Sequence, residues 1–113
     1  MNIKETQELL FEEYKKNGYL NMWTKCSPKF YTEEQRLADL AEVGLFNTEV
    51  SETLEAIRTF GYPMILEKIG EELADTIIRV FNFASRKGID MEFHILSKHE
   101  KNLKRGERHG KKI

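Results

Sequence analysis

Apolar residues recur along the chain at spacings of three and four, which is the period of an amphipathic α-helix. This pattern predicts four helices, over residues 3–17, 33–60, 65–87 and 91–104. No stretch alternates apolar and polar residues for long enough to indicate a β-strand. The sequence therefore predicts an all-α, four-helix-bundle-like fold with a long loop after the first helix.

Local signals mark the ends of these helices. Thr32, followed three residues later by Gln35, is a capping box and predicts the start of the second helix. Residues 61–63, Gly-Tyr-Pro, end that helix, and Gly88 ends the third. Asp90 is placed to cap the fourth helix.

Two acidic signatures lie near the centre of the chain. Glu49 and Glu52 are three residues apart on the second predicted helix, and Glu72 and Asp75 are three apart on the third. Residues three apart lie on the same side of a helix, so each pair points two carboxylates one way. If the two pairs converge, a hard divalent cation, Mg²⁺ or Mn²⁺, is the expected partner. The alternative is that each pair belongs to a solvated helix face.

Apolar residues surround both acidic pairs at helical spacing. Those expected to face inward are Leu37, Leu40, Ala41, Leu45, Thr48, Leu54 and Ile57 on the second helix, and Leu73, Ile77, Val80 and Ala84 on the third. On this pattern we expect the acids to border the buried stripe of each helix.

Length and composition narrow the class of protein. With 113 residues the chain is expected to form a single domain, residues 1–113. One cysteine, Cys26, cannot form an internal disulfide, which favours a reducing, cytoplasmic setting. No signal-peptide pattern and no apolar run of membrane-spanning length is present, so we expect no membrane partner.

The net charge of −1 is unevenly distributed. Residues 98–113 hold seven Lys or Arg and two Glu, which gives +5, and the remainder carries eleven basic and seventeen acidic residues, which gives −6. The basic tail, about residues 106–113, is expected to be flexible. An acidic body with such a tail suits a polyanionic ligand, a nucleic-acid contact or a tail that is merely solvated.

Several other chemistries are excluded by the motifs. No His has a Glu three residues before it, as a di-iron bundle requires, and HExxH is absent. There is no P-loop and no GxGxxG. Trp23, in the loop after the first helix, has two interpretations: a core residue, or a flat ring on which a nucleobase stacks.

The two acidic signatures in their context resemble a known family. Residues 47–56 and 71–78 are similar to the two signature segments of the MazG-like all-α nucleotide pyrophosphohydrolases. Downstream, residues 88–91 and 97–105 resemble the closing helix of that family, and residues 108–112 resemble its common tail. The resemblance extends over about residues 33–113.

This resemblance implies Mg²⁺-dependent hydrolysis of a nucleoside triphosphate to the monophosphate and pyrophosphate, in a homodimer or homotetramer. It implies four metal ligands, which are Glu49, Glu52, Glu72 and Asp75. It also implies three side chains that face the phosphates, which are Lys98, Asn102 and Arg105.

The chemistry of triphosphate hydrolysis agrees with these residue types, because a metal ion neutralises phosphate charge and activates water. Glu55 and Glu71 flank the signatures and are candidate general bases, with exposed helix charges as the alternative interpretation. Two other functions stay open. One is a nucleotide-binding sensor with negligible turnover, and the other is a small nucleic-acid-binding bundle that uses the basic tail.

Overall fold

A computed structural model describes residues 1–17 and 31–106. This part of the chain contains four helices, α1 (Ile3–Lys16), α3 (Glu33–Thr59), α4 (Met64–Arg86) and α5 (Met91–Arg105), and no strand. The all-α prediction is confirmed, and each observed boundary lies within one residue of the predicted one. The loop predicted after the first helix lies almost wholly outside the described residues.

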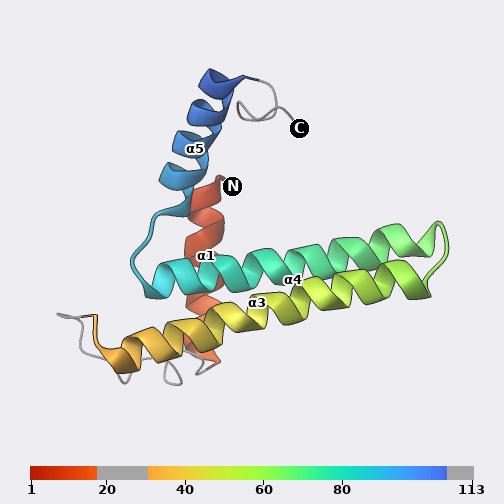
Figure 1. The fold of residues 1–113 in the computed structure, drawn as a ribbon, viewed down its shortest axis with the longest axis horizontal. Coiled ribbons are helices and arrows are strands. Elements are labelled where there is room, and N and C mark those ends of the chain that lie inside the picture. The colour runs from red at the N-terminus through yellow and green to blue at the C-terminus, as the bar shows by residue number, and fades with distance from the viewer. Residues whose placement is uncertain (18–30, 107–113) are drawn as a thin grey trace.

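Helices α3 and α4 form a long antiparallel hairpin (Figure 1). The capping box is present, because Thr32 Oγ1 accepts from the Gln35 backbone N–H while Gln35 Oε1 accepts from the Thr32 backbone N–H. Helix α4 continues through Gly70 without a break. Local caps therefore fix where the hairpin begins, and the turn at residues 61–63 reverses the chain.

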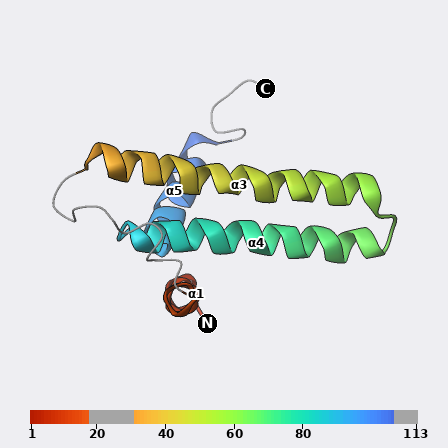
Figure 2. The same ribbon diagram turned by 90° about the horizontal axis from the view of Figure 1, so that it is seen from below.

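Helix α1 crosses α4 on the side away from α3, as Figure 2 shows with α1 seen end-on. Gln7 joins the two helices from a buried position. Its amide nitrogen donates to Ser85 Oγ and to the Ile89 carbonyl, both at 2.9 Å, and its Oε1 accepts from the Met91 N–H at 3.1 Å. One satisfied buried amide thus holds α1, the end of α4 and the start of α5 together.

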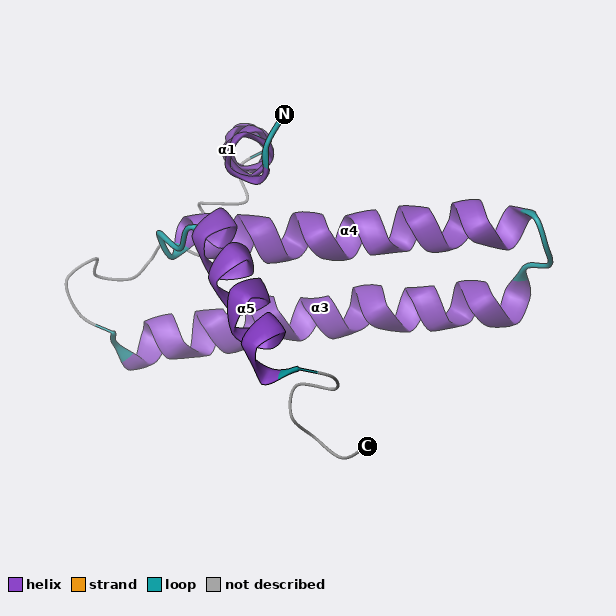
Figure 3. Cartoon of the chain, turned by 90° about the horizontal axis from the view of Figure 1, so that it is seen from above, coloured by secondary structure: helices purple, strands orange, loops and turns teal. Residues whose placement is uncertain are grey.

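Helix α5 leaves the hairpin at its open end and extends away from it beside α1 (Figures 1 and 3). Gly88 has a φ of +73°, a conformation that glycine adopts without steric cost, and this lets the chain turn out of α4. Asp90 then accepts from the Phe93 backbone N–H, which confirms the predicted cap of α5.

The contact between α3 and α4 buries several polar side chains, which corrects most of the expected inward face. Ala84 is buried as predicted, and Phe46 of α3 meets Phe83 of α4 edge-on, with ring centroids 5.9 Å apart. The buried residues of α3 are Asp39, Glu42, Glu49 and Ala56, and those of α4 are Asn82 and Ala84. By contrast Leu40 is 64% exposed, and Leu54 and Ile77 are about half exposed. The acids of the signature do not all border a buried apolar stripe, because Glu49 itself lies inside the contact and the apolar stripes point outward.

The helices of the described residues are too short or too polar to cross a membrane.

Candidate metal centre

The two acidic signatures meet midway along the α3–α4 hairpin. Glu49, Glu72 and Asp75 each place one carboxylate oxygen within 4.8 Å of the other two. Both helices supply ligand-type oxygens because the hairpin is antiparallel and each signature occupies the face turned to the other helix. Glu49 is buried, Glu72 is half-buried and Asp75 is exposed, so the group is open to solvent on one side.

Glu52 belongs to the same group. Its pKa is raised above the ordinary value, first by the close approach of the Glu72 carboxyl and then by the negative charge of Glu49. Like charges in one place disfavour ionisation, so this direction is the expected one. We name Glu49, Glu52, Glu72 and Asp75 together the carboxylate cluster.

Little in the described residues compensates the charge of this cluster. Arg79 Nε donates to Glu49 Oε1 at 2.6 Å and is the cluster's one ion pair within residues 1–17 and 31–106. Glu72 Oε2 is a buried atom that makes no hydrogen bond to any described residue. Among the described residues, four carboxyl groups thus face one guanidinium, and one buried carboxylate oxygen has no hydrogen-bond donor.

A second group of charged residues lies on the same helices, nearer the open end of the hairpin. Arg86 donates through Nη2 to Asp39 and through Nε to Glu42, the latter at 2.8 Å. Lys87 Nζ lies 2.8 Å from Asp39 Oδ2, and the Tyr31 hydroxyl donates to the same oxygen at 2.6 Å. We name Asp39, Glu42, Arg86 and Lys87 the charge-balanced cluster, because two acids meet two bases.

The two acids of the charge-balanced cluster shift in opposite directions. Burial favours a neutral Asp39, but hydrogen bonds from Lys87, Tyr31 and Arg86 outweigh it and hold the pKa of Asp39 below its ordinary value. Burial dominates at Glu42, whose pKa is raised despite the opposing charge of Arg86. The balance between burial and hydrogen-bond donors therefore sets the sign of each pKa shift.

The two candidate bases do not join the carboxylate cluster. Glu55 accepts from Thr59 Oγ1 at 3.3 Å and lies 3.8 Å from Arg58 on its own helix. Glu71 lies 3.7 Å from Lys68. Both side chains are more than half exposed, which matches the alternative interpretation of solvated helix charges.

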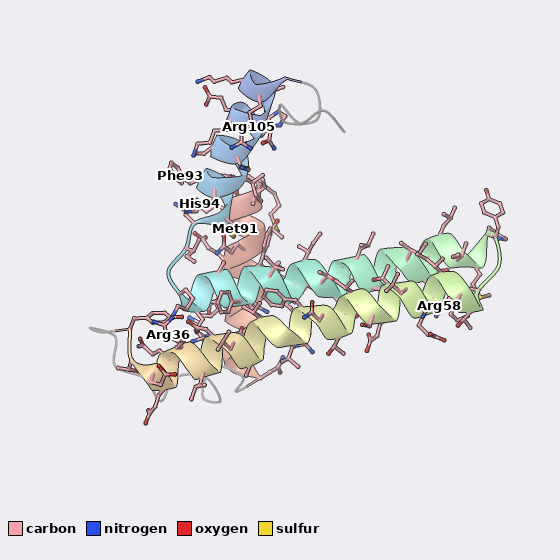
Figure 4. All side chains as sticks on the ribbon, in the orientation of Figure 1. Arg36, Arg58, Met91, Phe93, His94 and Arg105 are labelled. Carbon is pink, nitrogen blue, oxygen red and sulfur yellow. The ribbon has the colours of Figure 1, made fainter. Side chains whose placement is uncertain are left out.

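The predicted phosphate-facing residues lie elsewhere in the chain. Lys98, Asn102 and Arg105 share one side of α5, and Arg105 is at the end of α5 that points away from the hairpin (Figure 4). Asn102 Oδ1 is buried and has no hydrogen-bond partner among the described residues. A single chain therefore does not bring these residues to the carboxylate cluster. Trp23 lies outside the described residues.

Arg79 was missed from the sequence, although a signal for it exists. It follows Glu72 by seven residues and Asp75 by four, so it shares their face of α4. The contact between Glu42 and Arg86 is the contact between Glu49 and Arg79 moved by seven residues along both helices. Two ion pairs one heptad apart thus mark the antiparallel register.

The carboxylate cluster fits a hard divalent cation. All of its ligand-type atoms are carboxylate oxygens, which Mg²⁺ and Mn²⁺ prefer over softer donors. The unsatisfied Oε2 of Glu72 also favours a cation. A buried carboxylate oxygen without a hydrogen-bond donor costs free energy unless a cation binds it. Glu49, Glu52, Glu72 and Asp75 are the residues that would hold such an ion.

Comparisons with family models, with curated proteins and with solved structures gave no match to this chain.

Proposed function

We propose that this protein is a Mg²⁺-dependent nucleoside triphosphate pyrophosphohydrolase. The observation that carries the proposal is the convergence of the carboxylate cluster from α3 and α4, opposed among the described residues by the single guanidinium of Arg79. Clustered carboxylates of this kind are unfavourable without a cation, and a polyphosphate is the substrate class whose hydrolysis such a cation promotes. The resemblance of residues 47–56 and 71–78 to the MazG-like signatures supports the same choice.

In the proposed reaction, water adds to the α-phosphorus and the bond between the α- and β-phosphates breaks, which gives a nucleoside monophosphate and pyrophosphate. When bound, the divalent ion neutralises phosphate charge and lowers the pKa of water. Glu49 and Glu72 are held by the hairpin itself, so their carboxylates are positioned before a ligand arrives. Asp75 and Glu52 stand at the solvent side and leave the cluster accessible.

The proposed function includes assembly of at least two copies. Large apolar side chains form a stripe on α3 and another on α4, and each is roughly half exposed: Leu40, Leu54 and Ile57 on α3, and Leu66, Leu73 and Ile77 on α4. Exposed large apolar side chains that follow one helix face, instead of being scattered singly, are typical of an interaction surface. A second copy would cover it and could bring the residues of its own α5 to the carboxylate cluster.

The assembly is tested by sedimentation equilibrium. Wild type is expected to be a dimer or a larger oligomer at micromolar concentration, and Leu54→Arg is expected to dissociate it because a charge enters an apolar contact. Thr48→Arg, at an exposed polar position of the same helix, serves as the control and should leave the mass unchanged. A monomeric wild type would contradict this part of the proposal.

The activity is tested by a pyrophosphate-release screen over canonical and modified nucleoside triphosphates with Mg²⁺. Release is expected for wild type with at least one nucleotide, and it is expected to be lost with EDTA or with Glu72→Gln. Nucleotide binding without release would favour the sensor. Salt-dependent DNA binding that disappears on deletion of residues 104–113 would favour the nucleic-acid-binding bundle.

A further inference from the structure

Arg79 and Arg86 occupy equivalent positions on α4 but are held very differently. Arg86 is 6% exposed in its side chain and uses two of its nitrogens on two carboxylates. The Arg79 side chain is 42% exposed and uses Nε alone. Among the described residues, the Nη1 and Nη2 groups of Arg79 make no hydrogen bond. Arg79 is therefore half satisfied and free to reorient on its open side.

The carboxylate that Arg79 contacts belongs to the carboxylate cluster. The Glu49 side chain is 9% exposed, and its Oε1 accepts from Arg79. Sharing this oxygen with a second cation close by costs free energy. An ion pair to a half-exposed side chain is weak. A divalent ion carries twice the charge of the guanidinium, and three further carboxylates of the cluster would bind it together with Glu49. A cation that enters the cluster thus competes directly with Arg79 for Glu49.

We propose that Arg79 is paired with Glu49 in the metal-free chain and exchanges this carboxylate for a phosphate of the nucleotide when the cation binds. The proposal rests on the function proposed above. Once released, the guanidinium offers its planar fork of N–H donors beside the cluster, and that fork matches two phosphate oxygens. Arg79 would then supply, within one chain, the phosphate contact that was predicted for Lys98 and Arg105 of α5.

The exchange is tested first by NMR on wild type labelled with ¹⁵N. The Nε–H signal of Arg79, assigned by its loss in Arg79→Lys, reports the hydrogen bond to Glu49. Saturating Mg²⁺ is expected to move or broaden this signal, and addition of a non-hydrolysable α,β-methylene triphosphate is expected to move it to a third position. A signal that stays in place under saturating Mg²⁺ would overturn the proposal.

Affinities give the second test, by isothermal titration calorimetry with Mn²⁺ alone and then with the same analogue at saturating Mn²⁺. Arg79→Gln is expected to bind Mn²⁺ about two- to tenfold more tightly than wild type, and the analogue about tenfold or more weakly. Both changes are required, and the absence of either would overturn the proposal. Arg58→Gln, exposed at the turn end of α3, is the control and should match wild type (Figure 4).

Two outcomes separate this proposal from the proposed function. If wild type binds neither Mn²⁺ nor the analogue, the metal centre and the exchange both fail. If wild type binds both and Arg79→Gln matches it, the exchange fails while the metal centre stands. Should Arg79→Gln not fold, Arg79→Lys replaces it. Arg79→Lys keeps the positive charge, so its affinity for Mn²⁺ should stay near that of wild type. It lacks the planar fork of N–H donors, so its affinity for the analogue should fall. An unchanged affinity for the analogue would overturn the exchange.

Discussion

The two charged clusters on the α3–α4 hairpin are built on one register and differ in how far their charge is balanced. In the charge-balanced cluster, Arg86 and Lys87 meet two acids, and the side chains are buried or nearly so. In the carboxylate cluster, four acids meet one base, Arg79, within the part of the chain that the structure describes, and part of the cluster is open to solvent. The same helix pair therefore carries two kinds of charged cluster. The one near the open end has its charges balanced and holds the helices together, and the one at the centre has excess negative charge that a ligand could neutralise.

The largest expected effect comes from breaking the charge-balanced cluster. Arg86→Met leaves Asp39 and Glu42 buried without their shared partner, so the free energy of unfolding should fall by about 3–5 kcal/mol. Urea denaturation followed by circular dichroism measures this. Arg58→Met, which removes only an exposed intrahelical pair, should change it by less than about 0.5 kcal/mol. A loss below about 1 kcal/mol for Arg86→Met would mean that the cluster does not fasten the hairpin.

Removing charge from the carboxylate cluster should have the opposite, smaller effect on stability. Glu72→Gln or Glu52→Gln relieves repulsion among the acids, so the metal-free variants should be as stable as wild type or more stable. The same urea experiment in EDTA gives the answer. A large loss of stability in both variants would assign these carboxylates a structural role and weaken the metal centre.

The smallest effects are those of pH, and they should differ in sign between Asp39 of the charge-balanced cluster and Glu52 of the carboxylate cluster. The pKa of Asp39 is lowered on folding, because donors outweigh burial, so its contribution to stability is present above about pH 4 and is lost as the pH falls below that. The pKa of Glu52 is raised by Glu72 and Glu49, so the folded chain binds the proton more tightly and gains stability as the pH falls from neutral.

Urea denaturation from pH 7 to pH 3 tests these signs through variants. Relative to Asp39→Asn, wild type should lose stability at the acid end of this range. Relative to Glu52→Gln, metal-free wild type should gain stability as the pH falls from 7 towards 5. Parallel pH curves for wild type and both variants would show that neither carboxylate has the environment described above.

The helices could be predicted from the sequence because their signals are local. Thr32 and Gln35 form a cap within one turn, and so do Asp90 and the backbone of Phe93. The pairing of Glu49 with Glu52, and of Glu72 with Asp75, depends on a spacing of three and needs no tertiary knowledge. These features follow from short-range geometry that the sequence states directly.

Most of the inward-facing residues could not be predicted, because they depend on what each helix packs against, although Ala84 is buried as expected. Leu54 and Ile77 have helical apolar spacing, and a single-chain core was the natural expectation, but they point outward while Glu42 and Asn82 are buried. Burial of charge becomes acceptable only through a partner far along the sequence, such as Arg86 for Glu42. The direction of α5, which separates Arg105 from the carboxylate cluster, is likewise a tertiary property.

The central claim is that the carboxylate cluster binds a divalent cation, and thermal unfolding with and without Mg²⁺ tests it most directly. At a Mg²⁺ concentration about ten times the Kd, wild type should gain about 1.4 kcal/mol, which raises its Tm by several degrees. Glu72→Gln should show no such rise. An unchanged Tm for wild type, or an equal rise in both proteins, would contradict the account.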